Sequence, residues 1–251
     1  LLGVQVARED LRFLDDWDVA GMRATGSVSI MLHGDELFVP EYRCVDFRDV
    51  TSANIESGLA GSLWKAPSLG WAFSLMAGMS IGIAEGALER FLERSEGRPI
   101  RGTTYTNQRE APLTHLMLAE VHSKIQSAKL MCQANASETD RLGQLKAAGT
   151  PADPEYMQKF SARVLAETAY AAKWCAEAIE LLQRNSGATA IMNFDPIQRS
   201  WRDARVITLH GALNLEALSE NWGRLMAGLQ PHNFAGITTL DRFAPAALKA
   251  A

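Results

Sequence analysis

PIQRSWRDARVITLHG, residues 196–211, is the stretch that decides the fold, because it opens the last long helix that the sequence predicts. Pro196 suits the first position of a helix, where its missing N–H is not needed, and helical periodicity continues to about Ala227. The apolar positions share one broad face, made of Ile197, Trp201, Ala204, Thr208, Ala212, Leu215 and Leu218. Such a face packs against other helices. His210 falls on a different side, together with Arg199, Asp203 and Asn214.

Three more long helices are predicted upstream, over residues 67–95, 112–148 and 154–185. Gly97 and Pro99 stop the first of them. Pro112 opens the second, and Asp153 caps the third. Four long helices joined by short to medium loops are typical of an up-down bundle. We therefore expect a helical domain over residues 67–230, followed by a tail over 231–251.

The first 50 residues have a different character, with short runs that alternate apolar and polar residues, which is typical of strands. Residues 22–40 predict a strand, a turn at Gly34 and Asp35, a second short strand and a stop at Pro40. Three or four strands are too few for a self-sufficient sheet, and Leu1 already lies inside a predicted strand. We expect an α+β chain, mostly α, with a partial β-domain over residues 1–50, a linker over 51–66, and a missing upstream part.

Composition narrows the class of protein. The 29 acidic and 25 basic residues give a net charge of -4 with no block of like charge, which disfavours nucleic acid and anionic membranes as partners. The three cysteines, Cys44, Cys132 and Cys175, lie far apart, as free thiols of a reducing compartment do. No CxxC or HxxxH spacing indicates a metal site, and the most apolar stretch, residues 69–84, is short for a membrane span. We expect a globular, cytoplasmic protein.

Several phrases in order carry a resemblance to a known family: GMRATGS (21–27), LFVPEYR (37–43), GIAEGALERF (82–91), PLTHLMLAEVHSKI (112–125) and RSWRDARVITLHG (199–211). In this order and spacing they resemble the C-terminal two thirds of the acyl-CoA dehydrogenase superfold, over about residues 5–230. The resemblance implies a strand segment leading into a helical domain that assembles as a homotetramer.

Two classes of chemistry occur on that superfold, and the sequence favours one. The resemblance places the dehydrogenase base, a glutamate, after the RDAK-like segment, where this chain has Gly211. Other members carry the base on the first helix of the C-terminal domain, but residues 57–84 contain no Asp or Glu. Removal of a substrate α-proton needs a base. Acyl-CoA dehydrogenation is therefore disfavoured, although a dehydrogenase with a displaced base stays an alternative.

The pattern PxQRxWRDxxxxxxH, which ends at His210, resembles the two-component flavin-dependent monooxygenases that hydroxylate phenols and related aromatic or polycyclic substrates. The resemblance implies a separate flavin reductase that supplies reduced FMN or FAD, and reaction with O2 to a C4a-hydroperoxyflavin beside His210. An imidazole can donate a hydrogen bond or proton near neutral pH and stabilise a developing anion. His210 is thus the candidate catalytic residue. The alternative is an ordinary half-buried imidazole at the edge of the bundle.

Candidate cofactor contacts come from three loops. Arg23, Thr25 and Ser27 in GMRATGS lie where a loop meets a strand, beside a glycine that a turn would also explain. The resemblance matches Arg98 and Arg101 with an arginine that reaches the cofactor phosphates of a neighbouring subunit, as an arginine fork suits phosphate. A solvated loop charge is the alternative. Ser186 and Gly187 stand where dehydrogenases have a glycine-rich loop for the same cofactor, and amides there are able to hold an anion.

Candidate substrate contacts are Trp71 and Phe73 on the first helix, as an aromatic wall, and Asn214 on the predicted side of His210. Aromatic residues at such positions are otherwise bundle core. A further alternative for the whole chain is a non-catalytic helical assembly domain that lacks a complete flavin site. The sequence leaves the substrate and the choice between FMN and FAD open.

Overall fold

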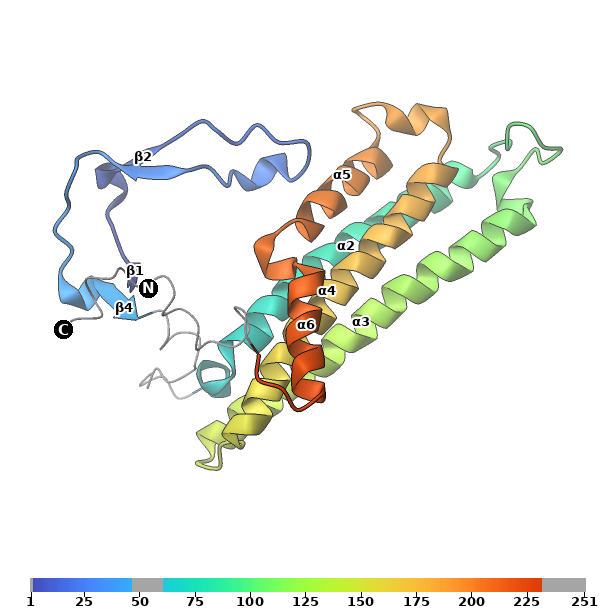
Figure 1. Ribbon diagram of the computed structural model, residues 1–251. Helices are drawn as coiled ribbons and strands as arrows, with labels where there is room; N and C mark the ends of the chain where they lie inside the picture. The colour runs from blue at the N-terminus through green and yellow to red at the C-terminus, as the bar shows by residue number, and fades with distance from the viewer. Residues whose placement is uncertain (1, 47–60, 232–251) are drawn as a thin grey trace.

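The computed structural model describes residues 2–46 and 61–231. Three long helices, α2 (Ser68–Ser95), α3 (Pro112–Ala147) and α4 (Pro154–Asn185), run side by side, and the shorter α5 (Pro196–Thr208) and α6 (Leu215–Met226) lie against them (Figure 1). The predicted helical bundle is confirmed. Residues 2–46 form an N-terminal arm that carries the strands.

Helix α4 lies at the centre of the bundle, where it packs against α2, α3, α5 and α6. Its small and branched residues allow this, because alanines let neighbouring helices approach closely while larger side chains fill the core. The largest cluster of buried side chains includes Phe91, Ile125, Ile179, Leu182 and Ile197, one or more from each of four helices. The core therefore joins α2, α3, α4 and the start of α5.

The predicted start signals of the helices are confirmed. Pro112 and Pro154 occupy the first helical positions of α3 and α4. The Asp153 carboxylate accepts the backbone N–H groups of Glu155 and Tyr156, at 2.9 and 3.1 Å, and so caps α4. Gly149 follows α3 with a φ of 77°, the left-handed conformation that a glycine favours after a helix.

The last predicted helix is wrong in one respect: it is not continuous to Ala227. Helix α5 ends at Thr208, a single 3₁₀ turn η7 (Gly211–Leu213) follows, and α6 begins at Leu215. His210 and Asn214 have extended backbones, with ψ of 133° and 99°, and cap η7 and α6. Caps with a side-chain acceptor compete with a continuous helix. The helical-wheel placement of His210 and Asn214 beside Asp203 therefore fails.

The N-terminal arm contains two short antiparallel ladders rather than one sheet. Strand β1 (Leu2–Val4) pairs with β4 (Cys44–Asp46), and β2 (Leu11–Phe13) pairs with β3 (Ile30–Leu32). The partial β-domain is confirmed. The strand expected after the turn at Gly34 and Asp35 is absent, since the described residues 36–39 form no strand and lead to the 3₁₀ turn η3 (Glu41–Arg43).

Helix α2 is, by length and composition, apolar enough to cross a membrane. Residues 69–84 alone are short for a membrane span, whereas the whole helix has 28 residues. The buried core helix of a bundle satisfies the same criterion. In this structure α2 packs against α3, α4 and α5.

Candidate active site around His210

His210 lies exposed at the break between α5 and η7. Its ring Nδ1 accepts the backbone N–H of Ala212 at 3.1 Å. A neutral imidazole has one donor and one acceptor nitrogen. Since Nδ1 is the acceptor, the neutral ring carries its proton on Nε2. The local backbone thus makes His210 a hydrogen-bond donor at an exposed position.

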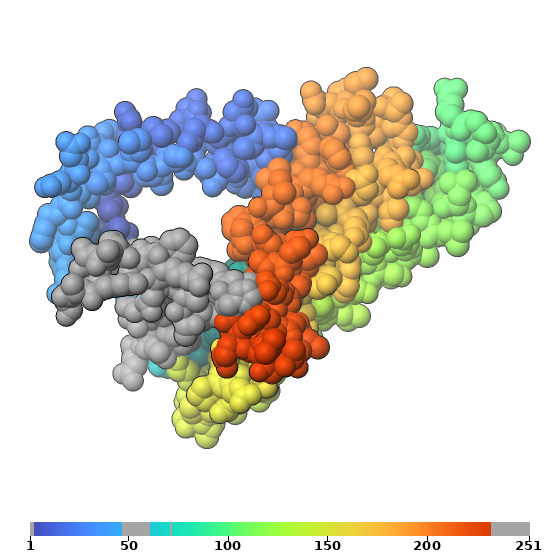
Figure 2. Space-filling model, in the orientation of Figure 1, coloured from blue at the N-terminus to red at the C-terminus, as the bar shows by residue number. Residues whose placement is uncertain are grey.

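The arm meets the bundle at the surface of α5, as Figure 2 shows for the segment around residue 20. The Asp203 carboxylate accepts the backbone N–H of Met22 at 2.6 Å. The guanidinium of Arg202 donates to the carbonyl of Ala20, also at 2.6 Å. Between them Gly21 is buried, and a Cβ there would lie 2.6 Å from the carbonyl oxygen of Arg202. Only a glycine fits this approach.

Met22 is the centre of this contact. Its backbone is left-handed, with a φ of 55°, which is uncommon for a residue with a side chain. Its carbonyl accepts the indole N–H of Trp17 at 3.2 Å and the hydroxyl of Thr25 at 2.7 Å. Its side chain packs against a small cluster that includes Ile207 and Leu213, which flank His210 in the chain. The arm and the histidine segment therefore share one cluster.

The predicted flavin loop leads away from this contact. Arg23–Thr25 form a 3₁₀ turn, and Gly26 has a φ of 58° with open space where a Cβ would lie. Arg23 and Ser27 are exposed, whereas the Thr25 hydroxyl already donates to Met22. The glycine is thus explained by its backbone angles, and Arg23 and Ser27 stay available for a ligand.

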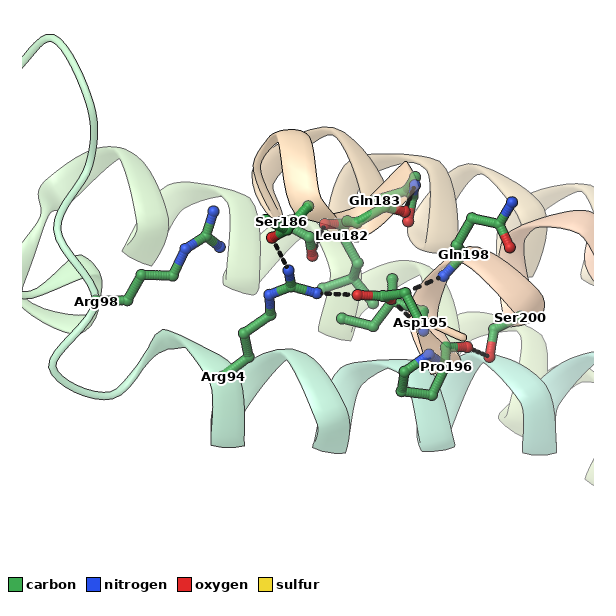
Figure 3. Close-up of polar contacts among 12 residues, drawn as sticks. Arg94, Arg98, Leu182, Gln183, Ser186, Asp195, Pro196, Gln198 and Ser200 are labelled. Carbon is green, nitrogen blue, oxygen red and sulfur yellow. Dashed lines mark hydrogen bonds and ion pairs between the residues drawn. The ribbon is translucent and has the colours of Figure 1, made fainter. Parts of the chain in front are cut away.

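The second set of predicted cofactor residues lies at the other end of α5. The guanidinium of Arg98 donates to the carbonyl of Asn185 at 3.5 Å and to the side chain of Gln108 at 3.3 Å. Figure 3 shows the Arg98 side chain extending from the loop after α2 toward Ser186 at the end of α4. Burial, and then the nearby Arg94, lower the pKa of Arg98. Gly187, with a φ of 75°, lies directly under this guanidinium. Arg98 therefore connects the loop between α2 and α3 with the segment that follows α4.

Ser186 and Arg101 differ in exposure. Ser186 is fully buried, and its hydroxyl donates to the carbonyl of Leu182 at 2.7 Å inside the last turn of α4. Arg101 is exposed in the loop between α2 and α3. Within this second set, the structure brings Arg98, Ser186 and Gly187 together and leaves Arg101 free to reach outward.

An anchor beside this loop escaped the sequence analysis. Asp195 is 5% exposed, accepts the N–H groups of Ile197 and Gln198 at 2.9 and 3.2 Å, and pairs with Arg94 through its other oxygen. Arg94 also donates to the hydroxyl of Thr189 at 2.6 Å. The signal was present, because an aspartate directly before Pro196 is an N-cap position.

The predicted substrate residues separate. Phe73 is 6% exposed and belongs to a buried cluster with Phe160 and Leu218, so it is core, as the alternative had it. The side chain of Trp71 lies outside the described part of the structure. Asn214 caps α6, and it lines an open hollow of about 450 Å³ between α4, α5 and α6 whose rim includes Leu209.

Comparison with known proteins adds to this geometry. Residues 74–215 match the family model described as acyl-CoA dehydrogenase, C-terminal domain. The chain is 27% identical to the oxygenase component of an FADH(2)-dependent resorcinol hydroxylase from Rhizobium sp., covering 86% of this chain and 53% of the relative. It is 26% identical to the oxygenase component of p-hydroxyphenylacetate 3-hydroxylase from Acinetobacter baumannii, covering 90% and 52%.

Solved structures agree. XiaF from Streptomyces sp., in complex with FADH2 and glycerol, superposes with a TM-score of 0.81 at 25% identity, over 93% of this chain and 57% of that one. The HsaA monooxygenase from M. tuberculosis gives a TM-score of 0.76 at 27% identity, over 92% and 57%. The chain thus spans about half the length of the curated relatives it matches.

Proposed function

The chain belongs to the acyl-CoA dehydrogenase family through its C-terminal domain, and from this premise we propose that it acts as part of the oxygenase component of a two-component flavin-dependent monooxygenase. The substrate is aromatic or polycyclic, and a separate flavin reductase delivers reduced FMN or FAD from solution. The route through a C4a-hydroperoxyflavin belongs to the proposal. Relatives named as hydroxylase oxygenase components support it.

The observation that carries the proposal is the donor state of His210. Reduced flavin, when bound, supplies the chemistry that activates O2. The chain itself supplies an N–H donor. Because Nδ1 of His210 accepts the backbone N–H of Ala212, the proton of the neutral ring lies on Nε2, which is able to donate to a ligand. A preoriented donor stabilises negative charge that develops on oxygen, because it needs no reorganisation when the charge appears.

Asp203, the acidic residue of the WRD segment, does not replace the dehydrogenase base. Asp203 accepts the Met22 amide at 2.6 Å and is thereby committed to the arm. Gly211, at the position where the family resemblance puts the base, carries no side chain. The chain's own residues thus offer a donor near the break in the helix and no carboxylate at the expected place, which favours oxygenation over α-proton removal.

The candidate flavin residues fit two different sites. Arg23 and Ser27 follow the turn that contacts Arg202 and Asp203, whereas Arg98 lies against Asn185 and Gly187 at the end of α4. Asp203, which contacts the arm, lies eight residues after Asp195 at the start of α5, about 12 Å along the helix axis at 1.5 Å per residue. We assign Arg23 and Ser27 to the chain's own flavin, and Arg101 to the phosphates of a neighbouring copy in a homotetramer.

The experiment is coupling in His210→Ala. Reduced FMN or FAD is mixed with O2 and a panel of phenols, and hydroxylated product is compared with released hydrogen peroxide. We expect flavin oxidation to continue while most of the product is replaced by peroxide, with the circular dichroism spectrum unchanged. His122→Ala, an exposed histidine on α3, is the matched control and keeps wild-type coupling.

Two outcomes overturn the proposal. Unchanged coupling in His210→Ala removes the histidine from the chemistry. Absence of binding when the protein is titrated with reduced and oxidised FMN and FAD favours the non-catalytic helical assembly domain instead. A dehydrogenase with a displaced base would show itself as dye reduction with acyl-CoA substrates.

A further inference from the structure

Two hydrogen bonds from adjacent residues of α5 hold the N-terminal arm against that helix. We propose that Asp203 and Arg202 are positioning residues, which clamp the turn Ala20–Met22 onto α5 so that the proposed flavin loop and His210 are held as one unit. This inference rests on the proposed function for its catalytic consequence. Its structural half stands on contacts between residues 181 and 182 positions apart in the chain.

The clamp holds the turn from both sides. Arg202 donates to the carbonyl of Ala20, and Asp203 accepts the amide N–H of Met22. Consecutive helix residues therefore bind the two ends of one turn. Arg202 is itself steadied, because its Nε donates to the side chain of Gln198 at 3.0 Å. Hydrogen bonds to charged groups are stronger than neutral ones. The turn is therefore fixed in rotation as well as in distance.

The backbone of the turn fits one arrangement only. Gly21 lies so close to the carbonyl of Arg202 that a Cβ would meet it at 2.6 Å. Met22 keeps a left-handed backbone that a side chain rarely adopts, and such conformations persist where the surroundings determine them. The Asp203 carboxylate is the group that accepts the Met22 amide in this conformation. Without this acceptor, we expect the turn to leave the left-handed conformation.

The clamp lies close to the histidine. Asp203 precedes His210 by seven residues, and the Met22 side chain packs with Ile207 and Leu213 on either side of it. Arg23 follows the clamped turn directly, and Ser27 lies four residues further along the chain. A displacement of the turn consequently changes the distance between the loop and the histidine while both keep their own side chains. We expect this to release peroxide as loss of His210 does.

The first measurement is hydrogen exchange, which needs no activity. In Asp203→Ala we expect the amides of the segment 20–25 to exchange about tenfold faster or more, since a charged acceptor has been lost. Asp203→Asn retains a side-chain oxygen and restores part of the protection. Gly21→Ala forces the turn away from α5, whereas Gly34→Ala, in the same arm with its Cβ in ordinary contact, leaves exchange unchanged. Equal exchange in Asp203→Ala and the wild type overturns the clamp.

The second measurement is the coupling of flavin oxidation to product formation, made as for His210→Ala. We expect Asp203→Ala and Gly21→Ala to divert reduced flavin to peroxide and raise the KM for reduced flavin several-fold, with Asp203→Asn intermediate and Gly34→Ala normal. If His210→Ala uncouples and these variants do not, the positioning role fails and the proposed function stands. If His210→Ala stays coupled while exchange rises, the proposed function fails and the clamp remains only structural.

Discussion

Replacing Asp195 with alanine removes two interactions with one side chain. The carboxylate caps α5 through the amides of Ile197 and Gln198 and pairs with Arg94, and it is 5% exposed. Loss of an N-cap costs about 1 kcal/mol, and stranding one partner of a buried ion pair costs about 3–5 kcal/mol. Because the Arg94 side chain is 23% exposed, water recovers part of its charge, so we expect about 3 kcal/mol in total.

Urea denaturation followed by circular dichroism measures this loss as a shift of the midpoint at constant slope. Asp195→Asn separates the two terms, since asparagine is a good N-cap but carries no charge for Arg94. We expect it to lose about 1–2 kcal/mol. A loss below about 1 kcal/mol in Asp195→Ala would refute the reasoning, because it falls within the value of a cap alone.

Two more predictions follow from shifted pKa values. Burial raises the pKa of Cys132 to about 11 and that of Cys175 to about 12, so both stay protonated at pH 8 and should resist a thiol reagent until the protein unfolds; rapid labelling of either in the native state would contradict this. Hydrogen bonds from Arg141 and Tyr156 lower the pKa of Glu138 to about 2. The folded pKa lies below the unfolded value, so the stabilisation is present above pH 4.5 and disappears as the pH falls toward 2. Glu138→Gln should therefore lower the Tm at pH 7 more than at pH 2, and the free energy of unfolding lost at pH 7 should be below about 1 kcal/mol, because the pair is partly exposed; an equal loss at both pH values argues against it.

The helices were readable from the sequence because their signals are local. Proline at the first turn, Asp153 as a cap and Gly149 after α3 each act on neighbouring residues, and apolar spacing fixes the buried faces. The break after Thr208 was missed because helical periodicity of apolar residues continues across it. After the helix ends, His210 and Asn214 act as caps of the next two turns, and Leu213 between them is buried in the core.

The site was readable only in part. The place of His210 in a motif predicts a catalytic role, which stays a prediction, and the hydrogen bond that its Nδ1 accepts depends on a backbone geometry that no pattern shows. The role of Asp203 was hidden, because its partner Met22 is 181 residues away. Likewise, Arg98 and Ser186 read as ligand contacts, although their polar groups are used inside the protein. Long-range pairing is what a single sequence lacks.

The break between α5 and α6 also bears on which length changes the protein tolerates. A residue inserted within α5 would rotate everything after it by about 100°, which would separate Asp195 at its start from Asp203 at its clamp. An insertion between Leu209 and Asn214 would keep Asp195 and Asp203 in register, but it would disturb the bond between His210 and the Ala212 amide and the buried Leu213. Length changes on either side of Leu209 should therefore differ in what they damage: the clamp when they fall within α5, and the oriented donor of His210 when they fall after it.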